Sequence, residues 1–288
     1  MNQNLRIRAF SFATPSFLRV GRILGTTCLQ QGFRDFTLFE PIDLEPSFQE
    51  KNLEILSHSR GAGYWLWKPY LLSRFVEKMG SNEAVLYLDC GLLPRKNAAF
   101  YSDLLVDDRI HVWETEGQVI QDWTEPNVLK ALEVPLALQK DPLVMGGAIL
   151  ARQSKIVKDF AKLWLHLCEN PDLLCPDAAT SYVNPKSIVW HRHDQSILSV
   201  IVALYPDWFH IHSKDRDELP YNSIFDLHRN PNLKVINVIL TFPQVRKYRQ
   251  QIVKLFPKAV RRALRNSLFN KTRKPISKAE IDAIRGTF

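Results

Sequence analysis

An unbroken apolar run that ends on a carboxylate constrains the fold of this chain more than any other feature. Residues 85–88 are Val, Leu, Tyr and Leu, and Asp89 follows them directly, with Gly91 two positions later. A run without alternation of apolar and polar residues is typical of a strand that is buried on both faces, as in a parallel sheet covered by helices. Ligands of such sheets bind beyond the carboxyl ends of the strands, so Asp89 lies where a site is expected.

Segments with helical spacing alternate with short apolar segments along most of the chain. Apolar residues recur at helical intervals in residues 16–31, 71–79, 98–106, 156–167 and 194–205. We interpret as strands the short apolar segments at residues 6–13, 36–39, 85–88, 110–113, 143–151 and 208–212. This alternation predicts an α/β domain with a mostly parallel sheet flanked by helices, which we place at residues 1–240.

The net charge of +8 is concentrated near the C-terminus. Residues 227–279 contain fourteen Lys and Arg and no Asp or Glu, so the rest of the chain has a net charge of −6. In residues 245–274, basic residues are interspersed with apolar residues at helical intervals, and we predict a basic helical extension over residues 241–288. Such a helix could bind an anionic membrane surface, or it could cover the domain with its basic face in water. Nucleic acid is disfavoured because no nucleic-acid-binding motif accompanies the charge.

The cysteines and the apolar segments bear on the compartment. The four cysteines form neither a C-x-x-C pair nor a zinc-binding spacing, which is typical of reduced thiols in a cytoplasmic protein, although four cysteines are also compatible with a disulfide. The N-terminus lacks the apolar core of a signal peptide. The longest strongly apolar run, residues 235–242, is too short to span a bilayer. We therefore expect a cytoplasmic protein, bound peripherally to the inner face of the membrane if the basic extension contacts lipid.

The segment at residues 60–69 combines cations, aromatic rings and glycines in the order R-G-A-G-Y-W-L-W-K-P. A flat ring such as Tyr64 or Trp65 can stack on a nucleobase, and Arg60 or Lys68 can neutralise a diphosphate. The alternative is a core cluster of aromatic residues with cations on the surface. We expect the aromatic residues of this segment to divide between the two roles.

Two further features suit a site that binds a phosphorylated ligand. Asp89 could hold Mg²⁺ or Mn²⁺ together with phosphate oxygens, or it could simply cap the loop that follows it. Gly146 and Gly147 lie within a predicted strand, where the absence of side chains lets a ligand or another backbone approach closely.

A group of polar residues precedes the helix predicted at residues 194–205. His193, Asp194 and Gln195 suit recognition of hydroxyl groups and general-base catalysis, although an acid at a helix N-terminus is favoured without any function. Their spacing matches no zinc site. Further along, His228 follows an apolar segment and could supply a metal or phosphate contact, or belong to a surface loop.

In order, these motifs resemble those of a known family. The series is R-G-x-G-Y-W-x-W-K-P, then Y-L-D-x-G, G-G-x-I-L-x-R, H-R-H-D-Q-S-I-L-S and H-R, over roughly residues 5–230. It is similar to bacterial nucleotide-sugar glycosyltransferases of the GT-A fold, in particular to those of capsule, lipopolysaccharide and other surface-glycan synthesis.

On the donor side, the resemblance implies a nucleotide-diphosphate sugar, with a UDP-hexose as the first expectation, and Mn²⁺ or Mg²⁺ as cofactor. Asp89 falls where the family carries its D-x-D motif, with Gly91 in place of the second acid. His228 is the candidate for a further metal ligand. Arg60, Tyr64, Trp65 and Lys68 would then hold the nucleotide and its phosphates.

On the acceptor side, the resemblance implies a glycan or a lipid-linked glycan as acceptor. Gly146 and Gly147 would line the donor sugar or the acceptor. Asp194 would be the general base, with His193 and Gln195 as sugar contacts. Glycosyl transfer needs a base on the acceptor hydroxyl and stabilisation of negative charge on the departing diphosphate, and this set of residues could supply both.

The rival interpretation is a non-catalytic α/β module that binds anionic membrane or nucleic acid through its basic C-terminal region. The chain lacks the G-x-x-x-x-G-K-[ST] and G-x-G-x-x-G motifs, which argues against an ATPase or a dehydrogenase. The sequence leaves open the sugar, the acceptor, the stereochemistry of transfer and the oligomeric state.

Overall fold

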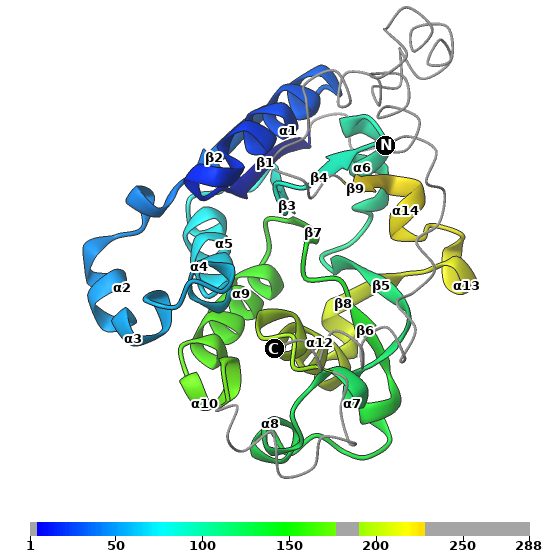
Figure 1. Ribbon diagram of the computed structural model, residues 1–288. Coiled ribbons are helices and arrows are strands. Elements are labelled where there is room, and N and C mark those ends of the chain that lie inside the picture. The colour runs from blue at the N-terminus through cyan, green and yellow to red at the C-terminus, as the bar shows by residue number, and fades with distance from the viewer. Residues whose placement is uncertain (1–4, 177–189, 228–288) are drawn as a thin grey trace, which may run out of the picture. The chain divides into compact units, whose positions relative to one another are not determined.

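The sheet that carries the site contains seven strands in the computed structural model, which describes residues 5–176 and 190–227 (Figure 1). In order across the sheet, the strands are β2 (Asp35–Phe39), β1 (Arg6–Phe12), β3 (Glu83–Leu88), β7 (Ala148–Arg152), β5 (Ile110–Val119) and β6 (Pro142–Val144), and β8 (Phe209–His212) also pairs with β5. β1 is parallel to β2 and β3, and β8 is parallel to β5. β7 is antiparallel to β3 and β5, and β6 is antiparallel to β5. Because the parallel pairs align more residues than the antiparallel pairs, the predicted α/β class with a mostly parallel sheet is confirmed.

Helices connect these strands, as the spacing of apolar residues predicts. They are α1 (Leu18–Gln30), α2 (Pro46–Lys51), α3 (Leu53–Leu56), α4 (Gly61–Tyr64), α5 (Trp67–Glu77), α6 (Ala98–Leu104), α7 (Ile120–Trp123), α8 (Pro126–Ala131), α9 (Lys155–Cys168), α10 (Pro171–Leu174), α12 (Asp194–Leu204), α13 (Lys214–Asp217) and α14 (Tyr221–Ile224). A small separate sheet pairs β4 (Leu92–Pro94) with β9 (Phe225–Leu227) in antiparallel fashion.

β3 is buried along almost its whole length. Residues 84–88 are all fully buried, as expected for a strand whose apolar run does not alternate. On one side of it, Tyr87 packs against Phe10 of β1, with ring centroids 5.1 Å apart. Burial on both faces fixes the direction in which β3 ends, and therefore the position of Asp89.

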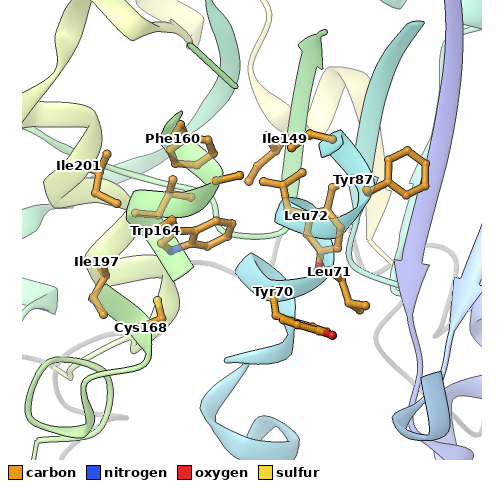
Figure 2. Packing of buried hydrophobic residues seen from close by; sticks show 14 of the residues in the cluster. Tyr70, Leu71, Leu72, Tyr87, Ile149, Phe160, Trp164, Cys168, Ile197 and Ile201 are labelled. Carbon is orange, nitrogen blue, oxygen red and sulfur yellow. The ribbon is translucent and has the colours of Figure 1, made fainter. Parts of the chain in front are cut away.

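The core continues between α5, α9 and α12. Figure 2 shows Leu71 and Leu72 of α5 and Trp164 of α9 within one buried cluster. Phe160 of α9 stacks on Trp164 at 5.6 Å and meets Phe209 of β8 edge-on at 5.2 Å. This packing sets the positions of the first residues of α5 and α12, both of which belong to the candidate site.

One predicted strand is wrong in detail. The segment at residues 143–151 forms two strands, β6 and β7, and residues 145–147 between them are not part of either strand. The backbone N–H of Met145 donates to the carbonyl of Trp113 at 2.7 Å, and the carbonyl of Gly147 accepts from the N–H of Asp89 at 2.8 Å. The break therefore turns the two glycines from the sheet toward the site.

The chain divides into two compact units, Met1–Pro231 and Asn232–Phe288. The predicted basic helical extension over residues 241–288 and the candidate ligand His228 lie outside the described residues. The domain boundary that we place after residue 240 therefore remains a prediction. Among the described helices, none has the length and hydropathy needed to cross a bilayer.

Candidate active site

A buried lysine lies at the centre of the candidate site. The Nζ atom of Lys68, in the first turn of α5, is 2.7 Å from Oδ2 of Asp194 and 2.9 Å from the carbonyl oxygen of Gly146. It is also 3.5 Å from Oδ1 of Asp89, directly after β3. Three segments that are far apart in the sequence therefore meet at one ammonium group. The structure places the side chain of Lys68, for which we predict a diphosphate contact, between two carboxylates, where it is only 4% exposed.

The two carboxylates differ in their exposure to solvent. The side chain of Asp194 is 5% exposed, whereas that of Asp89 is 26% exposed. Burial raises the pKa of Asp194 to about 6, and the attraction of Lys68 offsets only part of this effect. Burial lowers the pKa of Lys68, but attraction to Asp194 and Asp89 outweighs it and raises that pKa overall. Lys68 therefore remains charged, and the group has a net charge of −1 when both acids are ionised.

Asp89 is held by its neighbours at the end of β3. The hydroxyl of Tyr87 donates a hydrogen bond to Oδ1 of Asp89. Burial raises the pKa of Tyr87 well above its ordinary value, so this hydroxyl keeps its proton. A Cβ atom at Gly147 would lie 2.8 Å from Oδ2 of Asp89, closer than side-chain carbons approach their neighbours. The glycine predicted to allow close approach therefore makes room for the Asp89 carboxylate itself.

The second glycine packs against the start of α12. A Cβ atom at Gly146 would lie 3.1 Å from Cβ of Gln195 and 3.4 Å from Oδ2 of Asp194. The amide of Gln195 donates to the carbonyl of Val144 at 2.9 Å. Gln195 therefore anchors the first turn of α12 to β6 and keeps Asp194 beside Lys68.

A second group of residues surrounds His193. Its Nδ1–H donates to the carbonyl of Leu174 at 2.8 Å, and its Nε2 accepts from Nε of Arg60 at 2.9 Å. Burial lowers the pKa of His193 to about 4, so the ring is neutral and able to accept. The rings of Tyr64 and His193 lie 4.6 Å apart. The guanidinium of Arg60, on an exposed residue, lies 4.8 Å from the ring centroid of Trp190.

The backbone around this second group has an uncommon conformation. Ala62, Tyr64, Trp65 and His193 have φ angles of 52°, 51°, 62° and 53°. Positive φ is uncommon for residues with a side chain and is found preferentially at functional sites. This clustering supports placing the site between residues 60–66, which include α4, and the start of α12.

Of the aromatic residues in residues 60–69, Trp67 has the core role, and the nucleobase role expected of Tyr64 or Trp65 stays a prediction. Trp67 is buried in the core, where it stacks on Phe12 at 4.1 Å and donates to the carbonyl of Gly61 at 2.9 Å. Tyr64 and Trp65 are partly buried and lie beside His193.

Three aromatic residues of the site were not among the predicted site residues. Tyr87 orients Asp89, Trp190 lies under Arg60, and the indole N–H of Trp164 donates to the carbonyl of Asp194 at 3.1 Å. Only Tyr87 has a sequence signal, because residues two apart on a strand point to the same face. The other two contacts depend on tertiary packing.

His228, the candidate further metal ligand, follows Leu227, the last residue of the described range. Leu227 of β9 pairs with Leu92 of β4, three residues after Asp89. The described part of the chain therefore brings β9 next to the Asp89 loop.

Comparisons with known proteins find similarity at the level of three-dimensional structure. No protein-family model and no curated protein sequence matches the chain. One similar structure is a glycosyltransferase involved in glycosylation of the major capsid of PBCV-1, with 15% identity, a TM-score of 0.41, and coverage of 73% of this chain and 82% of that one. A second is mouse xyloside xylosyltransferase 1, with 13% identity, a TM-score of 0.40, and coverage of 73% and 86%. A third is the galactosyltransferase LgtC in complex with donor and acceptor sugar analogues, with 10% identity, a TM-score of 0.39, and coverage of 72% and 73%.

Proposed function

We propose that this chain is a glycosyltransferase of the GT-A type that transfers a hexosyl group from a nucleotide-diphosphate sugar, with UDP as the nucleotide. The observation that carries the proposal is the meeting of Lys68, Asp89, Gly146 and Asp194 around one ammonium group. Each of the first four motifs that resemble the family contributes one of these residues, and Lys68 and Asp194, which are 126 positions apart, are in contact at the carboxyl end of β3.

The donor end of the site is proposed to lie at Asp89. Its carboxylate is partly exposed and belongs to a group with a net negative charge, which suits a divalent cation. Mg²⁺ and Mn²⁺ need only one or two carboxylates when substrate phosphates supply further oxygens, so the chemistry of the site fits this cofactor. We propose Asp89 as one ligand and His228 as another. The cation would stabilise the charge that develops on the departing diphosphate.

The nucleotide is proposed to bind along the loop at residues 60–66. Arg60 offers an exposed guanidinium, and Tyr64 and Trp65 offer partly buried rings beside it. Lys68 contributes at one remove, because its ammonium fixes the position of both carboxylates. Gly146 and Gly147 are proposed to line the donor sugar or the acceptor, next to Asp194 and Asp89.

The acceptor end is proposed to lie at Asp194, acting as proton acceptor for the acceptor hydroxyl. A carboxyl group with a pKa of about 6 is close to the range in which a general base works best at neutral pH. His193 and Gln195 hold the start of α12 through Leu174 and Val144. In this role the carboxylate must be ionised, so kcat/KM should fall as the pH drops below about 6.

We further propose that the acceptor is a lipid-linked glycan of bacterial surface-polysaccharide synthesis at the inner face of the membrane. The support is the basic composition of residues 227–279, which has fourteen Lys and Arg and no acid. An anionic lipid surface attracts such a segment with about 1 kcal/mol for each basic residue near it.

The test is binding of donor followed by thermal unfolding. UDP-, GDP-, CMP- and dTDP-sugars are compared with and without Mn²⁺, in wild type, Asp89→Asn and the matched control Asp103→Asn, which alters an exposed acid on α6. A ligand specific for the native state raises Tm by mass action. We expect one nucleotide class to raise Tm with Mn²⁺ in wild type and in the control, but not in Asp89→Asn. Equal rises in all three proteins would exclude Asp89 from the donor site, and no rise with any donor would favour the rival binding module.

A further inference from the structure

A second cluster of polar side chains lies on β8. This strand pairs with one edge of β5, and β7 pairs with the opposite edge. His210 and His212 point to the same side of β8 because they are two residues apart on a strand. Nε2 of His210 lies 3.4 Å from Oδ2 of Asp217, which ends α13, and Nδ1 of His212 contacts the same oxygen. One ligand atom from each of the three residues lies within 4.8 Å of the others.

The local fold holds the carboxylate toward the two histidines. Oδ1 of Asp217 accepts hydrogen bonds from the backbone N–H groups of Ser213 and Leu219, both at 3.2 Å. This leaves Oδ2 for the two imidazoles. These two backbone hydrogen bonds fix the carboxylate of Asp217 in position, next to the two histidines.

A third histidine supports the cluster from the neighbouring strand. His111 of β5 is the register partner of His210, and its Nδ1 lies 2.8 Å from Nε2 of His212. Nε2 of His111 is buried and has no hydrogen-bond partner. The pair formed by His111 and His212 can therefore exist in two forms. In one form, Nδ1–H of His111 donates to Nε2 of His212. In the other, Nε2–H of His212 donates to Nδ1 of His111, and the proton of His111 is then on its Nε2.

The ligand atoms of these three residues are two imidazole nitrogens and one carboxylate oxygen. Groups of this kind bind a divalent metal when the ligating atom carries no proton.

We propose that His210, His212 and Asp217 form a binding site for Zn²⁺. Two imidazole nitrogens and one carboxylate oxygen form a three-ligand set found in zinc sites that keep a fourth position open. The side chain of His210 is 34% exposed, so water or another ligand can reach that position. With the ion on Nδ1 of His212, its Nε2–H donates to His111, which orients the ring as partners of metal-bound histidines do.

This site is separate from the proposed donor site. In the sheet, β7 and β5 lie between β3, which leads to Asp89, and β8. Zn²⁺ here would tie α13 to the strand that follows α12. The inference does not depend on the proposed function, because it uses none of the residues around Lys68.

Isothermal titration of the full chain with ZnCl₂, after removal of metal with EDTA, tests the proposal. Four proteins are compared: wild type, His210→Ala, the matched control His166→Ala on the exposed face of α9, and Asp89→Asn. We expect one equivalent of Zn²⁺ to bind to wild type, His166→Ala and Asp89→Asn. In His210→Ala, affinity should fall by more than the roughly 10- to 100-fold that loss of a ligand's hydrogen-bond partner costs.

His210 is the residue to change because its partial exposure makes the variant's fold least dependent on it. Circular dichroism and the Tm without metal should match those of wild type, and Zn²⁺ should raise Tm in wild type but not in His210→Ala. Absence of binding to wild type would overturn the proposal and leave the cluster as a hydrogen-bonded turn. Unchanged affinity in His210→Ala, or loss of binding in Asp89→Asn instead, would assign the ion to other residues.

Discussion

Asp194→Asn tests whether burial or attraction to Lys68 controls the candidate base. The carboxylate is 5% exposed and 2.7 Å from Nζ of Lys68, so two strong effects of opposite sign act on it. Attraction alone would lower the pKa of Asp194 below 3.8, and burial alone would raise it above this value. The structure places the pKa at about 6, which means that burial wins.

The sign of the resulting pH dependence follows from linkage. A carboxyl group with a raised pKa binds its proton more tightly in the native state than in the unfolded state. Its contribution to stability is fully present below pH 3.8 and is lost as the pH rises through about 6. At about 1.36 kcal/mol for each pH unit between these values, the contribution is roughly 3 kcal/mol. Asparagine does not titrate, so Asp194→Asn lacks this contribution.

The assay is urea unfolding of wild type and Asp194→Asn at intervals from pH 4 to pH 7. We expect wild type to lose about 2.4 kcal/mol of unfolding free energy relative to Asp194→Asn across this range, because part of the effect lies below pH 4. Taking the difference removes the titration of other groups. A constant difference in Asp194→Asn would refute the raised pKa. A difference of the opposite sign would show that attraction to Lys68 exceeds the cost of burial.

Two further predictions concern the residues that position the carboxylates. Gly147→Ala places Cβ 2.8 Å from Oδ2 of Asp89, so we expect turnover of the donor to fall by as much as about 100-fold. The control Gly80→Ala, whose Cβ would meet no atom closer than 3.9 Å, should leave turnover unchanged in the same assay. Trp164→Phe removes the indole N–H that donates to the carbonyl of Asp194, so urea unfolding at pH 7 should show a loss of roughly 1–3 kcal/mol in unfolding free energy. A loss below about 0.5 kcal/mol would contradict a stabilising role for this hydrogen bond.

Much of the fold could be predicted because its signals are local. The apolar run at residues 85–88 has no polar break, and the structure buries all of it. The helical spacing at residues 156–167 corresponds to α9, whose apolar face packs in the core. In both cases the periodicity of neighbouring residues carries the information, and tertiary contacts reinforce it.

The break between β6 and β7 could not be predicted from the pattern of residues in the sequence. Residues 143–151 have the composition of one strand, and Gly146 and Gly147 are compatible with a strand that is approached closely. What ends β6 is contact with partners that are distant in sequence, including the N–H of Asp89 and the start of α12. The two glycines indicated that another group approaches the backbone closely at these positions, but they did not indicate which group.

The position of Lys68 shows the same limit for the site. In sequence it stands beside aromatic residues in a cationic loop, which suggests a phosphate contact. In the structure it lies in the first turn of α5, and packing of this helix against the core turns its ammonium inward, toward Asp89 and Asp194. Sequence spacing identifies which residues belong to the site, whereas the pairing of charges depends on how two helices and a strand end meet.

On the proposed function, the buried lysine would let the two carboxylates serve different ends of one reaction. Without it, Asp89 and Asp194 would repel each other and the buried member would be neutral over a wider pH range. With Lys68 between them, Asp194 stays near the pKa at which it can exchange a proton at neutral pH, while Asp89 remains partly open to solvent and to a cation. Groups whose environments differ in this way divide into acid–base and electrostatic roles. On the proposed function, Lys68→Met should damage both ends of the site together, because its ammonium contacts both carboxylates.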